Sequence, residues 1–352
     1  MASCAAWVAE TGGASGSEAD GALAASVALL SRPETYGLPA DTPVAVRETR
    51  TSFVFLTPTE AYKLKKPIRD ALMDFTTLAA RRRNAEEETR LNARLAATVY
   101  LGVVPLARAA DGGLALGGPG EPVDWLVRMR RLFDDGFLDR ALAERRVDRR
   151  SIEAAAERLA GFYARQTLVA AAPAEHVAAA RRQILAARAI LLHPRFGLSR
   201  RRVTRLCGSL LHVARDGGPL ARRLALRPPV EGHGDLRPEH VWLDGAPLAI
   251  DCLEFSRPLR LVDPFDELGF LGLECERLGA PWVGPILLDA ATRALDDRPT
   301  PDILRHYRSF RAVLRAALAL RHYLEPPRRE PKRWMAQAKA YLRLAAADPP
   351  RG

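Results

Sequence analysis

Cysteine and long apolar runs are scarce in this chain of 352 residues, and each scarcity excludes something. Only four cysteines occur and none forms a CxxC pair, which argues against a zinc site or a disulfide framework and suits a reducing compartment. No apolar run reaches the roughly 18–20 residues of a membrane span. The N-terminus also lacks the basic start and apolar stretch of a signal peptide. We therefore expect a cytoplasmic protein with no membrane partner.

Lysine is scarce as well. It occurs only at Lys63, Lys65, Lys66, Lys332 and Lys339, so arginine supplies 53 − 5 = 48 of the basic residues behind the net charge of +11. The arginines accompany Ala, Leu and Glu in helix-like stretches, and no aromatic motif interleaves with them. We interpret them as solvated helix faces and expect no nucleic-acid partner.

The first part of the chain reads as a small sheet-based domain. Residues 1–24 are rich in Ala, Gly and Ser and are expected to be a disordered tail, with a short helix near 21–31. Strand-like segments are expected at 44–50, 51–57, 61–67, 103–109 and 124–132, with a glycine-rich turn at 111–120 and a long helix from 75 to about 97. We expect this N-terminal lobe to cover residues 25–131.

From residue 132 onwards the pattern is mainly helical. Long Ala/Leu/Arg stretches with helical periodicity lie at about 138–145, 151–171, 173–192 and 200–216, and helices resume after Pro264. Short apolar runs at 230–233, 241–243 and 248–251 interrupt them. The predicted C-terminal lobe, residues 132–352, is therefore helical with a polar strand-and-loop insert, where functional residues are often found.

That insert carries the residues with the clearest chemistry. Asp235 follows a short strand, His240 comes five residues later, and Asp251 ends the next apolar run. Phosphoryl transfer needs one carboxylate to orient the acceptor hydroxyl and another to hold Mg²⁺ against the phosphates. On spacing alone, an ordinary polar hairpin is an equal alternative, because Asp, Gly and Pro are common turn formers.

The motifs in this region resemble a known family. His233-Gly-Asp-Leu-Arg-Pro-Glu-His240 resembles the catalytic loop of the aminoglycoside phosphotransferase and choline kinase-like family, Ile250-Asp251 its metal-binding strand end, and Asp263-Pro-Phe-Asp-Glu-Leu268 the start of its next helix. The resemblance is closest to an uncharacterised bacterial branch. It implies an α+β, bilobal protein-kinase-like fold with a small N-terminal antiparallel-sheet lobe and a larger, mainly helical C-terminal lobe.

The resemblance also implies roles for these residues. Asp235 would be the catalytic base or orient the acceptor, Arg237 would steady the γ-phosphate, and Asp251 would bind Mg²⁺ that accompanies ATP. His240 stands where the family has a metal-binding Asn. Because histidine prefers softer metals, His240 is expected to bind Mg²⁺ poorly, favour Mn²⁺, contact phosphate or mark lost activity. His233 is expected to support the loop.

The N-terminal lobe offers a nucleotide site. A kinase needs a lysine on its third strand and a glutamate on the following helix to hold it. Strand alternation puts Ala61, Lys63 and Lys65 on one face, so both lysines remain candidates, with a solvated basic edge strand as the alternative. Glu88 fits the helix glutamate better than Glu86, for which a surface ion pair is expected. By resemblance, Ala61 would lie under adenine and Met129 at the hinge. The turn at 47–52 contains no glycine.

Other polar residues are expected to be structural. Glu267, Glu274 and Glu276 either line a pocket for a cationic acceptor or, as we favour, are surface charges of a helix. His306 and His322 lie on helices and are interpreted as structural.

We therefore predict an ATP- and Mg²⁺-dependent phosphotransferase that acts on a hydroxyl group of a small molecule. The first alternative is a nucleotide-binding regulatory protein without transferase activity, and a second is transfer of AMP instead of phosphate. The acceptor and the oligomeric state are not readable from the sequence.

Overall fold

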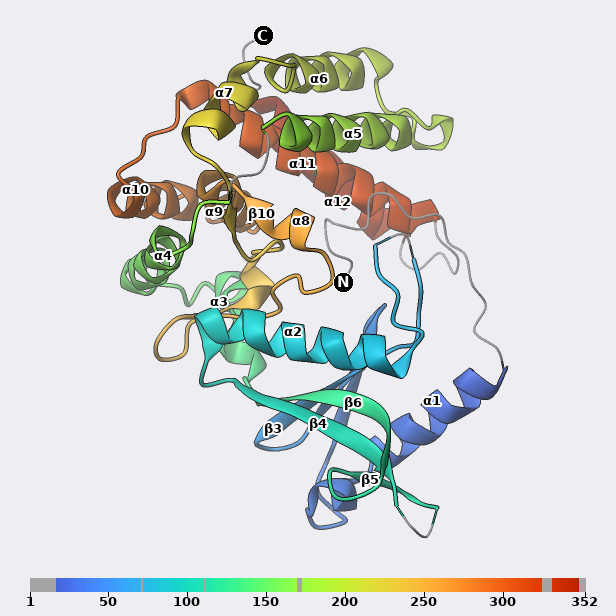
Figure 1. Ribbon diagram of the computed structural model, residues 1–352. Coiled ribbons are helices and arrows are strands. Elements are labelled where there is room, and N and C mark those ends of the chain that lie inside the picture. The colour runs from blue at the N-terminus through green and yellow to red at the C-terminus, as the bar shows by residue number, and fades with distance from the viewer. Residues whose placement is uncertain (1–16, 71, 110–111, 170–172, 325–330, 348–352) are drawn as a thin grey trace. The chain divides into compact units, whose positions relative to one another are not determined.

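The structure is a computed structural model, which describes residues 17–70, 72–109, 112–169, 173–324 and 331–347 (Figure 1). They form two compact units. The first contains the chain up to Asp134 together with Leu248–Arg257, and the second contains Asp135–Pro247 and the chain from Pro258 onwards. The expected boundary at residue 131 lies three residues before the observed one, and nothing in the sequence indicated that residues 248–257 belong to the first unit. Residues 1–16 of the expected tail lie outside the described residues. The tail prediction is wrong for residues 17–24, which belong to helix α1 because that helix begins at Ser17.

A six-stranded antiparallel sheet forms the centre of the first unit, in the order β1-β2-β3-β6-β4-β5. Its strands are β1 (Ala45–Glu48), β2 (Ser52–Leu56), β3 (Glu60–Lys65), β4 (Tyr100–Arg108), β5 (Leu114–Leu116) and β6 (Glu121–Arg130). The unit also contains helix α1 (Ser17–Leu30), the 3-10 turn η1 (Pro33–Tyr36), helix α2 (Leu78–Ala96) and the short strand β9 (Leu248–Ala249).

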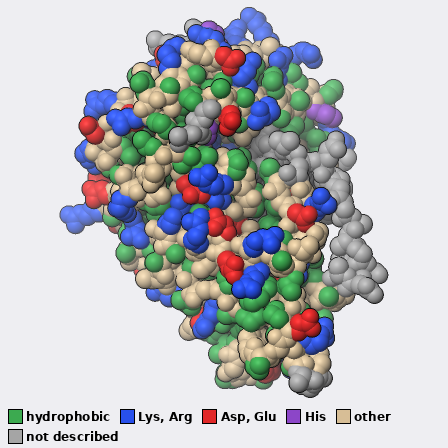
Figure 2. Space-filling model, in the orientation of Figure 1, with side chains coloured by type: hydrophobic (Ala, Val, Ile, Leu, Met, Phe, Trp, Pro, Cys, Tyr) green, Lys and Arg blue, Asp and Glu red, His purple; other side chains and the backbone are tan. Residues whose placement is uncertain are grey.

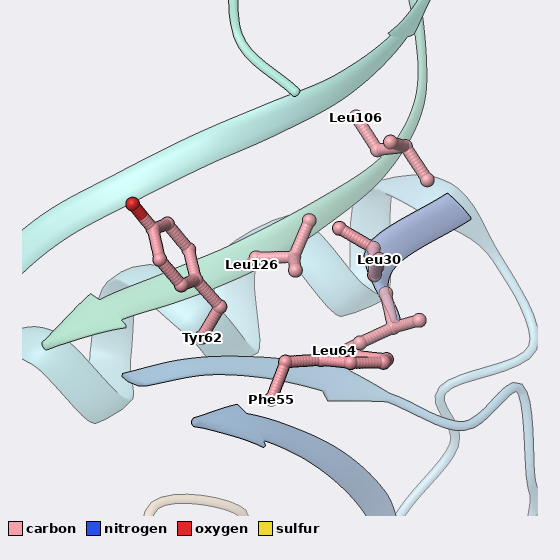
Figure 3. Packing of buried hydrophobic residues seen from close by; sticks show 6 residues of the cluster. All are labelled: Leu30, Phe55, Tyr62, Leu64, Leu106 and Leu126. Atoms are coloured by element: carbon pink, nitrogen blue, oxygen red, sulfur yellow. The ribbon is translucent and has the colours of Figure 1, made fainter. Parts of the chain in front are cut away.

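Alternation along β3 separates the hydrophobic core from the polar side chains. Tyr62 and Leu64 join a buried cluster with Phe55, Leu106, Leu126 and Leu30, the last from α1 (Figure 3). Lys63 and Lys65, which alternate with them, reach Glu88 on α2. One face of the sheet therefore packs this apolar core, and the other places the two lysines beside buried apolar residues such as Val127.

Strand β5 and the start of helix α2 differ from what the sequence pattern predicts. The expected turn at 111–120 contains β5, because Leu114 and Leu116 pack against the core cluster while Leu114–Leu116 pair with Leu106–Arg108 of β4. Helix α2 begins at Leu78, three residues after its expected start, because the Thr77 side chain caps it and accepts a hydrogen bond from the Ala80 backbone N–H at 3.2 Å.

The second unit is mainly helical. Its elements are η2 (Asp134–Gly136), α3 (Leu138–Ala143), α4 (Arg149–Ala164), α5 (Pro173–Leu191), η3 (Pro194–Phe196), α6 (Arg200–Val213), α7 (Pro219–Leu226), β7 (Val230–Glu231), η4 (Pro238–His240), β8 (Val241–Trp242), α8 (Arg257–Arg260), β10 (Leu261–Val262), α9 (Pro264–Arg277), α10 (Val283–Leu295), α11 (Pro301–Leu324) and α12 (Pro331–Ala347), with η2 and α8 at its borders. Helix α11 packs against α5, α9 and α12 (Figure 1). Strands β7 and β10 pair antiparallel and flank the segment that carries Asp235. Helix α7 and strand β10 were not anticipated from the sequence.

Charged side chains of both signs lie next to one another on the face in Figure 2. Several exposed arginines pair with acids one helical turn away, as Arg82 does with Glu86 at 2.9 Å. Within the described ranges, no helix combines the length and the apolar character needed to cross a membrane.

Candidate functional site

Two lysines and one glutamate form a buried charge cluster in the first unit. Lys63 Nζ lies 2.8 Å from Glu88 Oε1, and Lys65 Nζ lies 2.6 Å from Glu88 Oε2. Burial by itself raises the pKa of Glu88, but the two lysines outweigh it and hold that pKa below its ordinary value. The side chain of Lys65 is 1% exposed, whereas that of Lys63 is 13% exposed. Only Lys63 therefore has access to a ligand in solution.

Lys63, unlike Lys65, also pairs with Asp251. The Asp251 carboxylate accepts from Lys63 Nζ at 2.8 Å, and its side chain is 47% exposed. Burial alone would lower the pKa of Lys63, but Asp251, Glu88 and Glu254 hold it well above its ordinary value, so Lys63 stays charged. The backbone of Asp251 has φ +61°, a left-handed conformation that costs free energy for most residues and is frequent at functional sites.

Ala61 and Met129, the expected adenine contacts, lie opposite each other in the pairing of β3 with β6. Both side chains are less than 10% exposed. The glycine-free turn between β1 and β2 is held by a side chain instead: Thr49 Oγ1 accepts from the Ser52 backbone N–H at 3.0 Å. This hydrogen bond from the backbone to the threonine side chain stabilises the turn, which has no glycine.

The loop that carries Asp235 lies in the second unit and depends on two glycines. Gly234 has φ +90°, a backbone angle that residues with a side chain rarely adopt. At Gly232, an added Cβ would lie 2.5 Å from Val262 Cγ2 and closer still to Glu267 Oε2. The Glu267 carboxylate accepts from the backbone N–H groups of His233 at 2.8 Å and Gly234 at 2.5 Å. The loop can approach Glu267 this closely because it has no side chain there.

The two carboxylate oxygens of Asp235 differ. Oδ2 accepts from Arg237, with Nη2 at 2.9 Å and Nε at 3.1 Å. Oδ1 is buried and has no hydrogen-bond partner among the described residues. Burial would raise the pKa of Asp235, but nearby positive charge, above all that of Arg237, outweighs it and lowers that pKa, so the group is ionised at neutral pH. A buried, ionised and unpaired oxygen is a position at which a hydroxyl group can donate a hydrogen bond.

Arg237 and His240 are both engaged within the loop. The Arg237 guanidinium also pairs with Glu239, and its side chain is 2% exposed. His240 Nδ1 lies 2.8 Å from the Asp235 carbonyl oxygen, and its Nε2 lies 3.3 Å from Arg237 Nη2. Because a guanidinium has only donors, His240 Nε2 is the acceptor of that contact.

Glu267 and Glu274 correct one sequence interpretation. They are 1% exposed and are not surface charges of a helix. Glu267 also accepts from Tyr163 Oη at 2.5 Å, and Glu274 from Tyr341 Oη at 2.7 Å. Both carboxylates are satisfied inside the protein, so neither is set out for a cationic acceptor. Glu276 pairs with Arg308 at 2.5 Å.

The donors present fit a hard cation only in part. Asp251 offers exposed carboxylate oxygen, the ligand type that Mg²⁺ prefers. His240 offers a ring whose two nitrogens already have partners. In the described part of the chain, no three His, Cys, Asp or Glu side chains form a metal-binding group. A Mg²⁺ ion at Asp251 would therefore need phosphate oxygens and water as further ligands, which is its usual mode with nucleotides.

Sequence reasoning missed several residues that support Asp251. Tyr100 Oη accepts from the Asp251 backbone N–H at 3.2 Å, and Asn92 Oδ1 accepts from that of Cys252 at 2.8 Å. Glu254 lies 2.5 Å from Lys65. A second acid three residues after Asp251 was a signal for Glu254, whereas nothing in the sequence marks Tyr100 and Asn92.

Proteins of similar sequence are known from mycobacteria. No protein-family model matches the chain. Uncharacterised proteins of Mycobacterium tuberculosis and Mycobacterium bovis are 33% identical over 278 residues, which is 78% of this chain and 54% of each relative. The chain thus spans about half the length of the curated relatives it matches.

Among solved structures, choline kinase from Cryptosporidium parvum superposes with a TM-score of 0.50 at 8% identity, covering 92% of this chain and 95% of that one. A choline/ethanolamine kinase family protein from Mesorhizobium loti gives a TM-score of 0.49 at 15% identity, covering 86% and 88%. An ADP-bound aminoglycoside phosphotransferase gives 0.45 at 10% identity, covering 93% and 97%. The chain has an α+β protein-kinase-like fold. Within that class it has the fold of choline kinase, which confirms the fold that the motifs predict.

Proposed function

We propose that this protein is a phosphotransferase that uses ATP with a divalent cation and phosphorylates a hydroxyl group of a small molecule. The observation that carries the proposal is Asp235, which is ionised and fixed by Arg237 through Oδ2 while the buried Oδ1 has no hydrogen-bond partner among the described residues. In this arrangement Oδ1 accepts the proton, or the hydrogen bond, of the acceptor hydroxyl.

The first unit supplies the nucleotide-binding residues. Lys63, held by Glu88, binds the α- and β-phosphates, and Lys65 does not, because it is buried between two carboxylates. Adenine packs near Ala61 and Met129. Mg²⁺ held by Asp251 supplies charge neutralisation at the phosphates when bound. Arg237 holds Asp235 in position instead of contacting the γ-phosphate.

The test compares wild-type protein with Asp235→Asn. Release of ADP is measured with ATP, Mg²⁺ and a panel of small hydroxyl compounds, and nucleotide binding is measured by thermal shift. We expect a roughly 10²–10⁴-fold loss of acceptor-dependent turnover in the variant. Nucleotide binding should be unchanged, because Asp235 lies outside the lysine cluster. Equal turnover in both proteins would contradict the assignment.

One observation favours a nucleotide-binding protein without transferase activity. His240 stands where the kinase family has an Asn whose side-chain oxygen binds the metal. The His240 ring already contacts Arg237 and the loop backbone. This alternative predicts that ATP with Mg²⁺ or Mn²⁺ raises the melting temperature, whereas ADP release by the wild type does not exceed that of Asp235→Asn with any acceptor. Mass spectrometry of a product would separate transfer of phosphate from transfer of AMP.

A further inference from the structure

The segment Asp251–Glu254 carries a backbone conformation that needs outside support. Asp251 has φ +61°, and such positions persist only when surrounding structure over-determines them. Asp tolerates this region better than most residues, and Lys63 fixes its carboxylate, but an ion pair at the end of the side chain does not by itself fix the backbone angle. The source of support therefore lies in the residues that follow and in what they contact.

Hydrogen bonds tie the start of the segment to β4 and α2 of the same unit. The backbone N–H groups of Asp251 and Cys252 donate to Tyr100 on β4 and to Asn92 on α2. Asn92 is itself fixed, because its Nδ2 donates to the Glu88 backbone carbonyl at 2.8 Å. The helix that places Glu88 beside the lysines thus also places the metal-binding aspartate.

A buried ion pair ties the other end. Lys65 Nζ lies 2.5 Å from Glu254 Oε1, and the two side chains are 1% and 8% exposed. A buried ion pair contributes little net stability, because desolvation offsets most of the attraction. Its geometry is demanding, however: Lys65 also lies 2.6 Å from Glu88, so Glu254 is held at one point relative to the whole cluster.

We propose that Lys65 and Glu254 are positioning residues that preset Asp251 for a metal-bound nucleotide. Lys65 ties the segment to β3 two residues from Lys63, so Asp251 is held at the lysine that binds phosphate. The assignment rests on the proposed function, since it concerns the cation side of the same site. It gives Lys65 a role distinct from that of Lys63, although both lie on one face of β3.

The test is a Mg²⁺ titration of full-length wild type and Glu254→Gln followed by thermal shift at a fixed, saturating ATP concentration. Glutamine keeps the size and one acceptor but removes the charge. We expect the Mg²⁺ concentration for half of the shift to rise by about tenfold or more, as is typical when a residue that supports a metal ligand is lost. The shift caused by ATP in the presence of EDTA should stay as in the wild type.

Two further variants make the result interpretable. Asp124→Asn removes another buried carboxylate of the first unit, which pairs with Arg81 at 2.8 Å, and should lower the melting temperature without changing the Mg²⁺ midpoint. Glu254→Asp keeps the charge but shortens the side chain, so its midpoint should lie between those of the wild type and Glu254→Gln. If Glu254→Gln does not fold, a midpoint of Glu254→Asp equal to that of the wild type would overturn the positioning role.

The outcomes separate the two proposals. A Mg²⁺ midpoint in Glu254→Gln equal to that of the wild type, or an equal increase in Asp124→Asn, would overturn the positioning role and leave the proposed function standing. If wild-type protein shows no Mg²⁺-dependent shift with ATP, the metal-nucleotide site is itself wrong and both proposals fall.

Discussion

One buried histidine that resists protonation should make the second unit sensitive to acid. His306 lies on α11, is 1% exposed, and stacks on Phe310 with ring centroids 5.9 Å apart. Its Nδ1 has no hydrogen-bond partner among the described residues. Burial lowers the pKa of His306 from 6.5 to about 4, because the interior disfavours the charged ring.

The sign and size of the effect follow from linkage. Above pH 6.5 both the folded and the unfolded chain hold a neutral ring, and His306 contributes nothing. As the pH falls from 6.5 to about 4, the unfolded chain binds a proton that the folded chain does not, so the free energy of unfolding decreases. The full gap of about 2.5 pKa units, at 1.36 kcal/mol per unit, amounts to about 3 kcal/mol. For a unit of this size the melting temperature would fall by about 10 °C.

The assay compares melting temperatures of wild type and His306→Phe from pH 4.5 to 8. Phenylalanine keeps the stack on Phe310 and removes the proton site. We expect the difference in stability between the two proteins to shift in favour of the variant as the pH falls through 6.5. Ile303→Val, on the same helix, should cost about 0.5–1.5 kcal/mol at every pH and serves as the control. A difference between wild type and His306→Phe that is constant over the whole range would refute the reasoning.

This measurement also decides how a pH–activity profile is read. The lowered pKa of Asp235 keeps the proposed base ionised well below pH 6. A loss of activity between pH 6.5 and 4.5 that disappears in His306→Phe therefore reports unfolding of the second unit and not protonation of the base.

Two further substitutions test the clusters around the site. Glu88→Leu leaves Lys63 and Lys65 without their shared carboxylate, and the first unit should lose roughly 3–5 kcal/mol in denaturant unfolding, with an unchanged stability counting against the bridging role. Gly232→Ala drives a methyl group into Glu267, and should cost about 1–3 kcal/mol in the same assay and lower turnover; full activity would mean that the loop does not depend on this close approach.

The strand pattern of the first unit could be predicted because its signal is local. Alternation in residues 60–65 places Tyr62 and Leu64 in the core and Lys63 and Lys65 on the opposite face, as the structure shows. The same alternation could not separate the two lysines. Their difference comes from Asp251 and Glu254, which are 188 and 189 residues away in the sequence.

Glu267 and Glu274 show a second limit of local patterns. Surface and buried acids look alike on a helix whose residues are apolar on most sides, and α9 is buried along nearly all of its length from Pro264 to Cys275. Their partners are distant in the sequence: the Tyr163 and Tyr341 hydroxyls, from α4 and α12, are among the groups that satisfy these carboxylates inside the protein. Strand β5 was missed for a related reason: three apolar residues between glycines read as a turn until a neighbouring strand pairs with them.

The charge balance of the lysine cluster makes a final prediction about Asp251. Lys63 and Lys65 contribute +2 and Glu88, Asp251 and Glu254 contribute −3, which leaves −1. A buried charge without a counter-charge is costly. We therefore expect the excess negative charge at Asp251, whose side chain is exposed to water.

Asp251→Asn balances the cluster and keeps a residue type that tolerates the left-handed backbone. We expect a melting temperature equal to or above that of the wild type, together with loss of the Mg²⁺-dependent shift with ATP. A clear fall in melting temperature would mean that Asp251 is held for the stability of the fold, because a residue kept for ligand binding should cost the free protein nothing when its charge is removed.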